Sequence, residues 1–195
     1  MDIKQIVKAY PTRYSLEYKK FPSYHRIKRL EKVASLVEGK TLLDAGCSDG
    51  LFLKMVHELR PDMELSGMDY DRDAIDYAKT LSDLDLRYGN VESLPYENET
   101  FDTVVCMETL EHVNNLEKAV DEIIRVLKPT GKAIITIPIE TGLIGTLKRI
   151  GRKILRREDT HEHFDEKILE NYLSTKIIYT WRAPFGLGKL YVVKK

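Results

Sequence analysis

From residue 41 onward, short apolar runs rich in branched side chains alternate with longer amphipathic stretches. The short runs have the length and composition of buried strands, and the stretches between them carry apolar residues at helical spacing. Strands joined by crossover helices form a parallel sheet with helices on both of its faces. This alternation therefore predicts an α/β fold. The expected strands are residues 41–44, 64–69, 84–88, 103–107 and 132–138, and the expected helices include residues 50–60 and 116–127.

The two ends of the chain extend this pattern. Residues 24–37 read as a helix preceded by an aromatic-rich segment, so we predict a helical cap over residues 1–40. Near the other end we expect a helix at about residues 165–173, followed by strands at residues 176–182 and 189–193 that form an antiparallel hairpin.

A proline and a glycine mark the boundary between the helix at residues 116–127 and the fifth strand. Pro129 cannot continue a helix, and Gly131 allows a tight reversal. We therefore expect residues 128–131 to end this helix and to turn the chain into the next strand.

The turn after the first strand, residues 44–50, consists of small and acidic residues. Glycines at positions 46 and 50 allow backbone to approach a ligand, and the amides at the start of the following helix favour a ligand carboxylate. A dinucleotide-binding loop requires Gly-x-Gly-x-x-Gly, but Ser48 and Leu51 stand at its second and third glycine positions. A phosphate-binding loop of the Gly-x-x-x-x-Gly-Lys type is absent as well. The turn therefore indicates a different small-molecule site.

This segment resembles motif I of the class I methyltransferases that use S-adenosylmethionine (SAM), whose pattern is acidic-x-Gly-x-Gly-x-Gly. Asp44, Gly46 and Gly50 match this pattern, and Ser48 replaces the middle glycine with another small residue. Further segments similar to the family's motifs follow in the same order over residues 42–138. The resemblance implies a single Rossmann-like, seven-stranded and mostly parallel sheet with an antiparallel C-terminal hairpin, with SAM as the cofactor.

The resemblance also implies where SAM binds. Asp69 would hold both ribose hydroxyls, and Asn90, in place of the family's acid, would accept a hydrogen bond from the adenine amino group. The implied cofactor-binding residues are Asp44, Gly46, Cys47, Ser48, Gly50, Asp69, Tyr70, Asn90, Val91 and Met107. Each has a simpler interpretation as well: Asp69 could cap the helix that starts near Asp71, and the glycines could serve a tight turn alone. Asp102 is expected to hold loops near the strand start.

Glu108, Glu111 and His112 follow the fourth strand and are the candidate catalytic residues. On a turn or short helix their spacing places them on one face, which suits a general base or a metal site. The segment resembles the Glu-x-x-Glu-His of ubiquinone-biosynthesis O-methyltransferases and small-RNA 2'-O-methyltransferases, where these side chains hold a divalent metal. His163 or His161 would supply a further ligand. Without metal, Glu111 and His112 would serve as loop hydrogen-bonding residues, and this is the interpretation we prefer.

Residues 143–157 interleave apolar and basic side chains. In the family that the chain resembles, the region after the fifth strand helps form a substrate lid, which gives residues 139–165 this expected role. A basic amphipathic helix also suits peripheral contact with an anionic membrane, and it is equally compatible with a solvated surface helix.

The charge balance of the chain limits which class of molecule the methyl acceptor can be. Lysine plus arginine and aspartate plus glutamate both number 31, so no overall positive field favours nucleic acid, and we do not expect a nucleic-acid substrate. We expect one cytoplasmic domain over residues 1–195 that methylates a small molecule, for example a hydroxyl of a lipid-linked, quinone-like or sugar compound. The alternative is a catalytically degenerate SAM-binding regulatory or partner protein.

Overall fold

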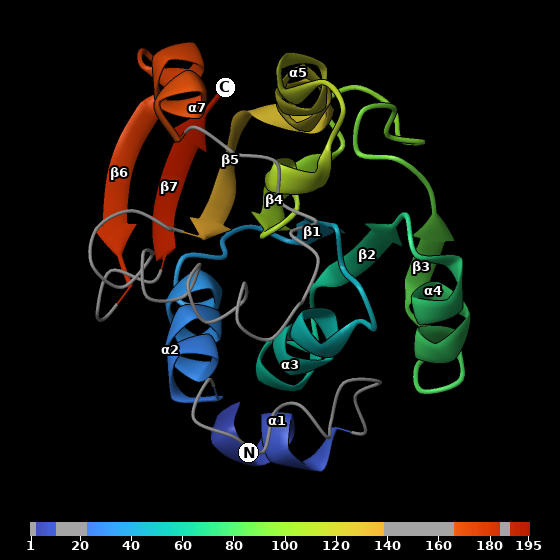
Figure 1. The fold of residues 1–195 in the computed structure, drawn as a ribbon. Helices are drawn as coiled ribbons and strands as arrows, with labels where there is room; N and C mark the ends of the chain where they lie inside the picture. Colours follow the sequence, from blue (N-terminus) through green and yellow to red (C-terminus); the bar gives the residue numbers. More distant parts are fainter. Residues whose placement is uncertain (1–2, 11–22, 139–165, 184–187) are drawn as a thin grey trace, which may run out of the picture.

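The computed structural model describes residues 3–10, 23–138, 166–183 and 188–195. These residues form a seven-stranded sheet with the strand order β3-β2-β1-β4-β5-β7-β6 (Figure 1). Strands β1 to β5 are parallel, and β7 runs antiparallel to β5 and to β6. The predicted mostly parallel sheet with an antiparallel C-terminal hairpin is therefore confirmed. The strands are β1 (Thr41–Ala45), β2 (Glu64–Asp69), β3 (Asp85–Tyr88), β4 (Phe101–Met107), β5 (Leu127–Pro138), β6 (Ile177–Arg182) and β7 (Gly188–Lys194).

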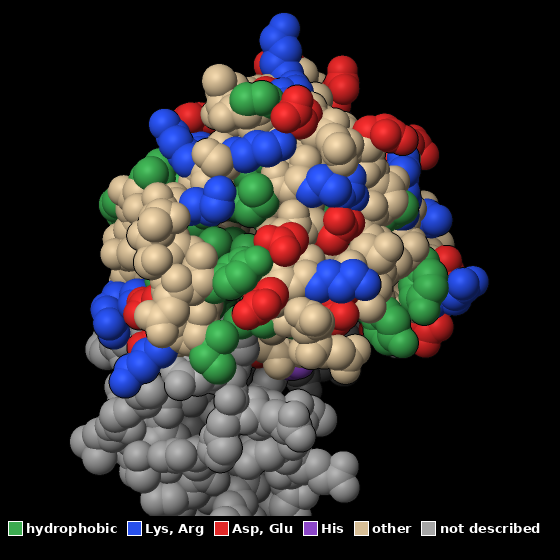
Figure 2. Space-filling model, turned by 90° about the horizontal axis from the view of Figure 1, so that it is seen from above, with side chains coloured by type: hydrophobic (Ala, Val, Ile, Leu, Met, Phe, Trp, Pro, Cys, Tyr) green, Lys and Arg blue, Asp and Glu red, His purple; other side chains and the backbone are tan. Residues whose placement is uncertain are grey.

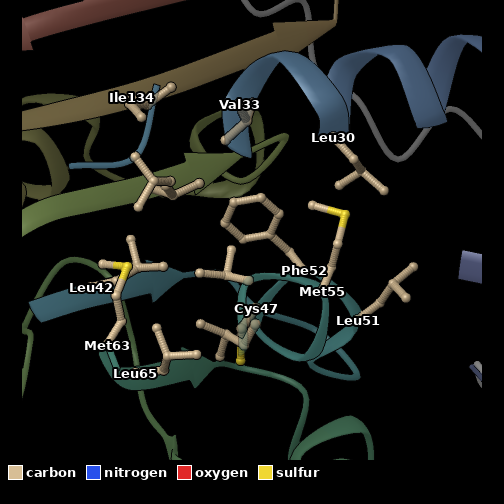
Figure 3. Packing of buried hydrophobic residues seen from close by; sticks show 14 of the residues in the cluster. Leu30, Val33, Leu42, Cys47, Leu51, Phe52, Met55, Met63, Leu65 and Ile134 are labelled. Carbon is tan, nitrogen blue, oxygen red and sulfur yellow. The ribbon is translucent and has the colours of Figure 1, made fainter. Parts of the chain in front are cut away.

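Helices cover both faces of this sheet, as the alternating sequence pattern predicts. Successive strand residues point to opposite faces, so Leu42 joins the core under one helix layer and Leu43 joins the core under the other. Leu30, Phe52 and Leu42 come from three elements and pack in the first of these cores (Figure 3). The first layer holds α1 (Ile3–Ala9), α2 (Ser23–Ala34), α3 (Leu51–Leu59) and α4 (Arg72–Lys79), and the second holds α5 (Leu116–Val126) and α7 (Glu166–Leu173).

The structure differs from the sequence prediction near residues 128–131. Helix α5 ends at Val126 as expected, but the next residues belong to β5 and do not form a separate turn. Phe101 pairs with Leu127 and Thr103 pairs with Lys132, so the extra residues of β5 form an irregularity opposite β4. The physical reason is that a residue before proline favours extended backbone, which continues a strand as readily as it begins a loop.

The N-terminal region contains a helix, α1, that the sequence analysis did not predict. Helix α2 also ends earlier than expected, at Ala34, because the chain tightens: the amide of Val37 donates to the carbonyl oxygen of Ala34 at 3.2 Å. The left-handed Gly39 follows, with φ of 81°. The extent of the cap and the single-domain assignment over residues 1–195 stay predictions.

Asp102 has the structural role expected for it. Its Oδ2 atom accepts hydrogen bonds from the amides of Lys40 at 2.9 Å and Thr41 at 3.0 Å, and its Oδ1 atom lies 3.0 Å from Nζ of Lys128. A Cβ atom at Gly39 would overlap the Asp102 side chain. This contact ties the segment before β1 to the start of β4.

The surface bears on membrane contact and on charge. In the described part of the chain, no helix is long and apolar enough to cross a membrane. Basic and acidic side chains are intermixed on the face shown in Figure 2. The basic segment at residues 143–157 lies outside the described residues.

Candidate functional site

The candidate site is a cleft of about 960 Å³ at the carboxyl ends of the central strands. The strand order reverses between β1 and β4, and ligands of open α/β sheets bind beside such a reversal. The volume suits a small-molecule ligand. Of the residues predicted to bind cofactor, those that line the cleft are Asp44, Gly46, Cys47, Ser48, Asp69, Tyr70, Asn90, Val91 and Met107. Gly50 is buried at the start of α3 and does not belong to this lining set.

The turn between β1 and α3 uses left-handed backbone at alternate positions. Gly46, Ser48 and Gly50 have φ of 93°, 50° and 77°. Ser48 therefore keeps the conformation for which a glycine is usually required, at a cost of about 1 kcal/mol. A Cβ atom at Gly46 would overlap the side chain of Thr109, so this glycine also allows the loops after β1 and β4 to pack closely.

The backbone amides of this turn already have protein partners. The amides of Gly46 and Cys47 both donate to the carbonyl oxygen of Met68, at 2.7 and 3.0 Å, and the amide of Gly50 donates to Cys47 at 2.9 Å. The amide of Ser48 donates to Oδ2 of Asp69 at 2.7 Å. These four amides are therefore satisfied by the turn's own backbone and by β2. The expectation that the amides at the start of the following helix favour a ligand carboxylate stays a prediction.

Asp69, at the end of β2, is not a helix cap. Asp71 caps α4, because its Oδ1 atom accepts from the amide of Ala74 at 3.0 Å. Asp69 instead accepts from the amides of Ser48 and Asp71, the latter at 2.8 Å, and it lines the cleft. Each carboxylate oxygen can accept a further hydrogen bond from a ligand.

Asn90 and Tyr70 stand near Asp69 on the cleft wall. The Oδ1 atom of Asn90 accepts a hydrogen bond from the amide of Glu92 at 2.9 Å, which fixes the side chain next to β3. Tyr70 is 72% exposed, and its ring centroid lies 5.9 Å from that of Tyr88. An exposed aromatic ring at a cleft provides a surface for a planar ligand group.

Asp44 is the most deeply buried acid of the cleft. Its exposed fraction is 1%, and no described residue gives its Oδ1 atom a hydrogen-bond partner. Burial raises the pKa of Asp44 to about 8, and the nearby Asp69 carboxylate adds to the rise. Buried polar atoms in native proteins nearly always have partners, so this oxygen indicates a ligand or solvent contact on the cleft side.

The candidate catalytic residues lie in the loop after β4 and not on one helix. Glu108 has left-handed backbone with φ of 49°, and the short 3₁₀ helix η1 (Leu110–His112) begins only after it. Glu108 therefore lies outside the helical turn on which the three residues were expected, although its charge acts on Glu111, and the catalytic role of the three residues stays a prediction. Glu108 and His112 line the cleft, whereas Glu111 does not belong to the lining set.

Glu108 and Glu111 have different surroundings. Glu108 forms an ion pair with Nη1 of Arg29. Glu111 is half-buried, and its Oε2 atom is buried with no hydrogen-bond partner among the described residues. Burial raises the pKa of Glu111 to about 7, and Glu108 adds to the rise.

Over the described part of the chain, no group of His, Cys, Asp and Glu side chains is arranged to hold a metal ion. His161 and His163 lie outside the described residues.

Sequence analysis missed the contribution of α2 to the cleft. Arg26 and Arg29 of this helix line the cleft. Burial lowers the pKa of Arg26, against the opposite effect of Asp49. The signal was their spacing, because residues 26, 29, 30 and 33 share one helix face and Leu30 and Val33 are buried.

Comparison with known proteins identifies this arrangement. Residues 43–135 match the family described as Methyltransferase domain. This part of the chain, just under half of it, is similar to methyltransferase domains. The region includes the end of β1, all of β2, β3 and β4, most of β5 and all the predicted cofactor-binding residues.

Curated relatives match about half of the chain. A probable S-adenosylmethionine-dependent methyltransferase of Mycolicibacterium smegmatis is 28% identical over 109 residues, which cover 55% of this chain and 42% of that protein. A ubiquinone biosynthesis O-methyltransferase of Coxiella burnetii is 31% identical over 112 residues, which cover 55% of this chain and 47% of that protein. The chain thus matches less than half of the length of these relatives.

A solved structure extends the similarity beyond the matched region. The PH0226 protein of Pyrococcus horikoshii has a TM-score of 0.74 and 20% identity, with 97% of this chain and 98% of that chain covered. At this identity the similarity establishes the fold alone.

The methyltransferase family implies SAM as the cofactor, and the residues of this cleft fit it. SAM carries positive charge on its sulfur and its amino group, and acidic residues predominate among the charged residues of the cleft. Asp44 has an oxygen without a described partner, and Asp69 has accepting capacity for hydroxyl groups.

Proposed function

We propose that the protein transfers a methyl group from SAM to a hydroxyl of a small-molecule acceptor. The observation that carries this proposal is the unpartnered, fully buried oxygen of Asp44 in a cleft of the methyltransferase domain. A cationic ligand would pair with this carboxylate. When bound, SAM supplies a methyl group on a positively charged sulfur. Transfer of this methyl group to the acceptor oxygen would break the carbon–sulfur bond and leave its electron pair on sulfur, giving S-adenosylhomocysteine (SAH) as the second product.

The residues on the cofactor side would bind and orient SAM. Asp69 would accept hydrogen bonds from the ribose hydroxyls, and Asn90 would accept one from the adenine amino group through the second lone pair of Oδ1. Tyr70 and Val91 would cover the adenine ring from the cleft wall. Alignment of the reacting atoms is the main contribution that a protein makes to such a displacement.

The residues after β4 would face the acceptor. A hydroxyl loses its proton as the new bond forms, so a base with a pKa near neutrality is suited to accept it. Glu111 has this property because burial raises its pKa to about 7. Glu111 itself does not line the cleft, so Glu108 or His112, which do, would hold the acceptor and relay its proton to Glu111.

Substitution of Glu111 tests this assignment. We expect Glu111→Gln to lower kcat by about a hundredfold or more, because general-base catalysis contributes about that much, and to leave SAH affinity within about twofold. Asp121→Asn is the control, because this exposed acid lies on α5 away from the cleft. Equal losses of kcat and SAH affinity would contradict a role on the acceptor side.

The acceptor itself can be found by an untargeted search for methylated products. Incubation of metabolite extracts with the protein and SAM carrying an isotope-labelled methyl group should produce a labelled small molecule, detected by mass spectrometry. Chelator-treated protein provides the comparison for metal dependence. Labelled macromolecules with no labelled small molecule would contradict the proposed acceptor class.

One observation favours a second function. The Glu108 carboxylate is engaged by Arg29, as expected for a site that binds SAM without turnover. In that case the protein would act as a SAM-binding regulatory or partner protein. SAH binding by calorimetry, with no labelled product in any extract, would support this alternative.

A further inference from the structure

The wall of the cleft that α2 forms differs in charge from the rest. Arg26 and Arg29 are the only arginine or lysine side chains among the described residues that line the cleft. The acidic lining residues are Asp44, Asp49, Asp69, Glu92 and Glu108. An acidic cleft suits the cationic sulfur and amino group of SAM, but it does not explain why two guanidinium groups face the same space.

The two arginines lie near different loops. Asp49, in the loop after β1, is the strongest favourable charge acting on Arg26, which places this arginine on the cofactor side. Arg29 pairs with Glu108, in the loop after β4, which places it on the proposed acceptor side. Arg29 is therefore the better placed of the two to contact an acceptor.

The present partner of Arg29 leaves part of its guanidinium unused. Nη1 pairs with one oxygen of Glu108, while Nε is buried and has no hydrogen-bond partner among the described residues. A guanidinium group binds a carboxylate or a phosphate most strongly through two parallel hydrogen bonds. The ion pair with Glu108 is partly exposed, with 20% of the Arg29 side chain and 35% of the Glu108 side chain accessible. Such pairs are weak enough to exchange for a better partner.

We infer that the methyl acceptor is an anion whose carboxylate or phosphate group binds Arg29 in place of Glu108. This inference rests on the proposed function and adds the chemical class of the acceptor. Exchange of partners would leave the Glu108 carboxylate free at the cleft, so that binding of the acceptor exposes an additional acid beside Glu111. Without a bound acceptor, the ion pair with Glu108 would neutralise the charge of Arg29.

The test measures anion binding and needs no turnover. The probes are 4-fluorobenzoate and 4-fluorophenyl phosphate, observed by fluorine NMR with the full chain saturated with SAH, and uncharged 4-fluorobenzamide is the comparison. We expect both anions to bind and the amide not to bind. Arg29→Gln should weaken anion binding at least about tenfold, the loss expected for a charged hydrogen-bond pair. Lys28→Gln should have no effect, because Lys28 lies on the same helix, pairs with Glu31 and does not belong to the cleft lining.

Glu108→Gln distinguishes an anion site from a merely structural ion pair. If Glu108 competes with the ligand for Arg29, its neutralisation should strengthen anion binding several-fold. The double variant Arg29→Gln/Glu108→Gln leaves no unpaired charge and should bind anions as weakly as Arg29→Gln alone. Thermal unfolding of each variant checks that the fold is retained. Unchanged anion affinity in folded Arg29→Gln, or weaker binding in Glu108→Gln, would overturn the inference.

The carboxylate of the cofactor is the competing source of the anion. 5'-Methylthioadenosine lacks this carboxylate and serves as the comparison with SAH. If Arg29→Gln weakens SAH binding but not 5'-methylthioadenosine binding, Arg29 binds the cofactor and the inference is overturned. If the unaltered protein does not bind SAH at all, the proposed function fails, whereas normal anion binding by Arg29→Gln contradicts the inference alone.

Discussion

Asp69 illustrates how one side chain combines a structural and a proposed binding role. Its carboxylate holds the amide of Ser48 at 2.7 Å and is proposed to accept the ribose hydroxyls of SAM. We expect Asp69→Ala to weaken adenosine binding by about 1.5 to 3 kcal/mol, as for the loss of a charged hydrogen-bond acceptor. Adenine, which lacks the ribose, should bind the variant as it binds the unaltered protein in calorimetry. An equal loss for adenine would assign the effect to the loop alone.

Asp44 makes ligand affinity and stability depend on pH. Its pKa in the folded protein is about 8, above the usual value of about 3.9. The folded state therefore binds more protons than the unfolded state between these pH values, and its stability should fall as pH rises through this range. Asp69, Cys47 and Cys106 are the titratable groups that act on or are acted on by this carboxyl.

Cationic SAM would favour the ionised form of Asp44. Binding of SAM below pH 8 should therefore release a proton, and SAM affinity should increase with pH up to about 8. SAH, whose sulfur is uncharged, should show a smaller increase. Calorimetry in buffers of different ionisation enthalpy measures the proton release directly. Asp44→Asn should abolish the proton release on SAM binding and reduce the loss of stability between about pH 4 and pH 8, and a variant that keeps both unchanged would contradict this assignment.

At the scale of elements, Asp102 clamps the segment before β1 to the start of β4. Partial burial raises its pKa, but the hydrogen bonds from Lys40, Lys128 and Thr41 outweigh this effect, and the pKa lies well below its ordinary value. The clamp therefore stabilises the fold above about pH 4 and weakens as pH falls below that value. We expect Asp102→Ala to lower the free energy of unfolding by about 2 to 3 kcal/mol in urea denaturation, for two lost backbone hydrogen bonds and an ion pair. Asp83→Ala, at an exposed position, is the control.

The sequence predicted elements well where their periodicity was long and regular. Strands β1, β2 and β4 contain apolar residues bounded by polar ones, and helix α5 has a complete apolar face, so their positions agree with the prediction to within two residues. Helix α1 was missed because Ile3–Ala9 is too short for its pattern to stand out. The irregularity in β5 was missed because proline and glycine predict a turn locally, whereas pairing with β4 is a tertiary contact.

The sequence predicted those site residues that lie in local motifs and missed those whose position depends on tertiary contacts. Asp44 and Asp69 lie at the ends of β1 and β2, and Asn90 follows β3. Parallel strands bring their carboxyl ends to one edge, so the meeting of these residues follows from the order of the motifs. The arginines of α2 were missed because their position depends on how this helix crosses the sheet. The ion pair between Arg29 and Glu108 joins residues 79 positions apart, and no local pattern encodes it.

At the scale of the whole molecule, Tyr10 connects the N-terminal helix to the cofactor loop. Its ring is buried, and its hydroxyl donates to the carbonyl oxygen of Asp49 at 2.8 Å. Tyr10 follows α1, and its own amide donates to Ile6 at 2.9 Å. Ordering of the loop by SAH should therefore stabilise α1, and by reciprocity α1 should support SAH binding.

This coupling can be measured from both of its ends. In the unaltered protein, SAH should slow hydrogen exchange at the amide of Tyr10 as well as in the cofactor loop. Tyr10→Phe keeps the ring and removes only the hydroxyl, so it should cost about 1 kcal/mol of stability and weaken SAH binding by a fewfold. In this variant SAH should still protect the loop but protect α1 less. Tyr172→Phe, at an exposed hydroxyl that donates to Asp121 on α5, is the matched control. Equal protection of α1 by SAH in both variants would show that the N-terminal helix and the cofactor loop are ordered independently.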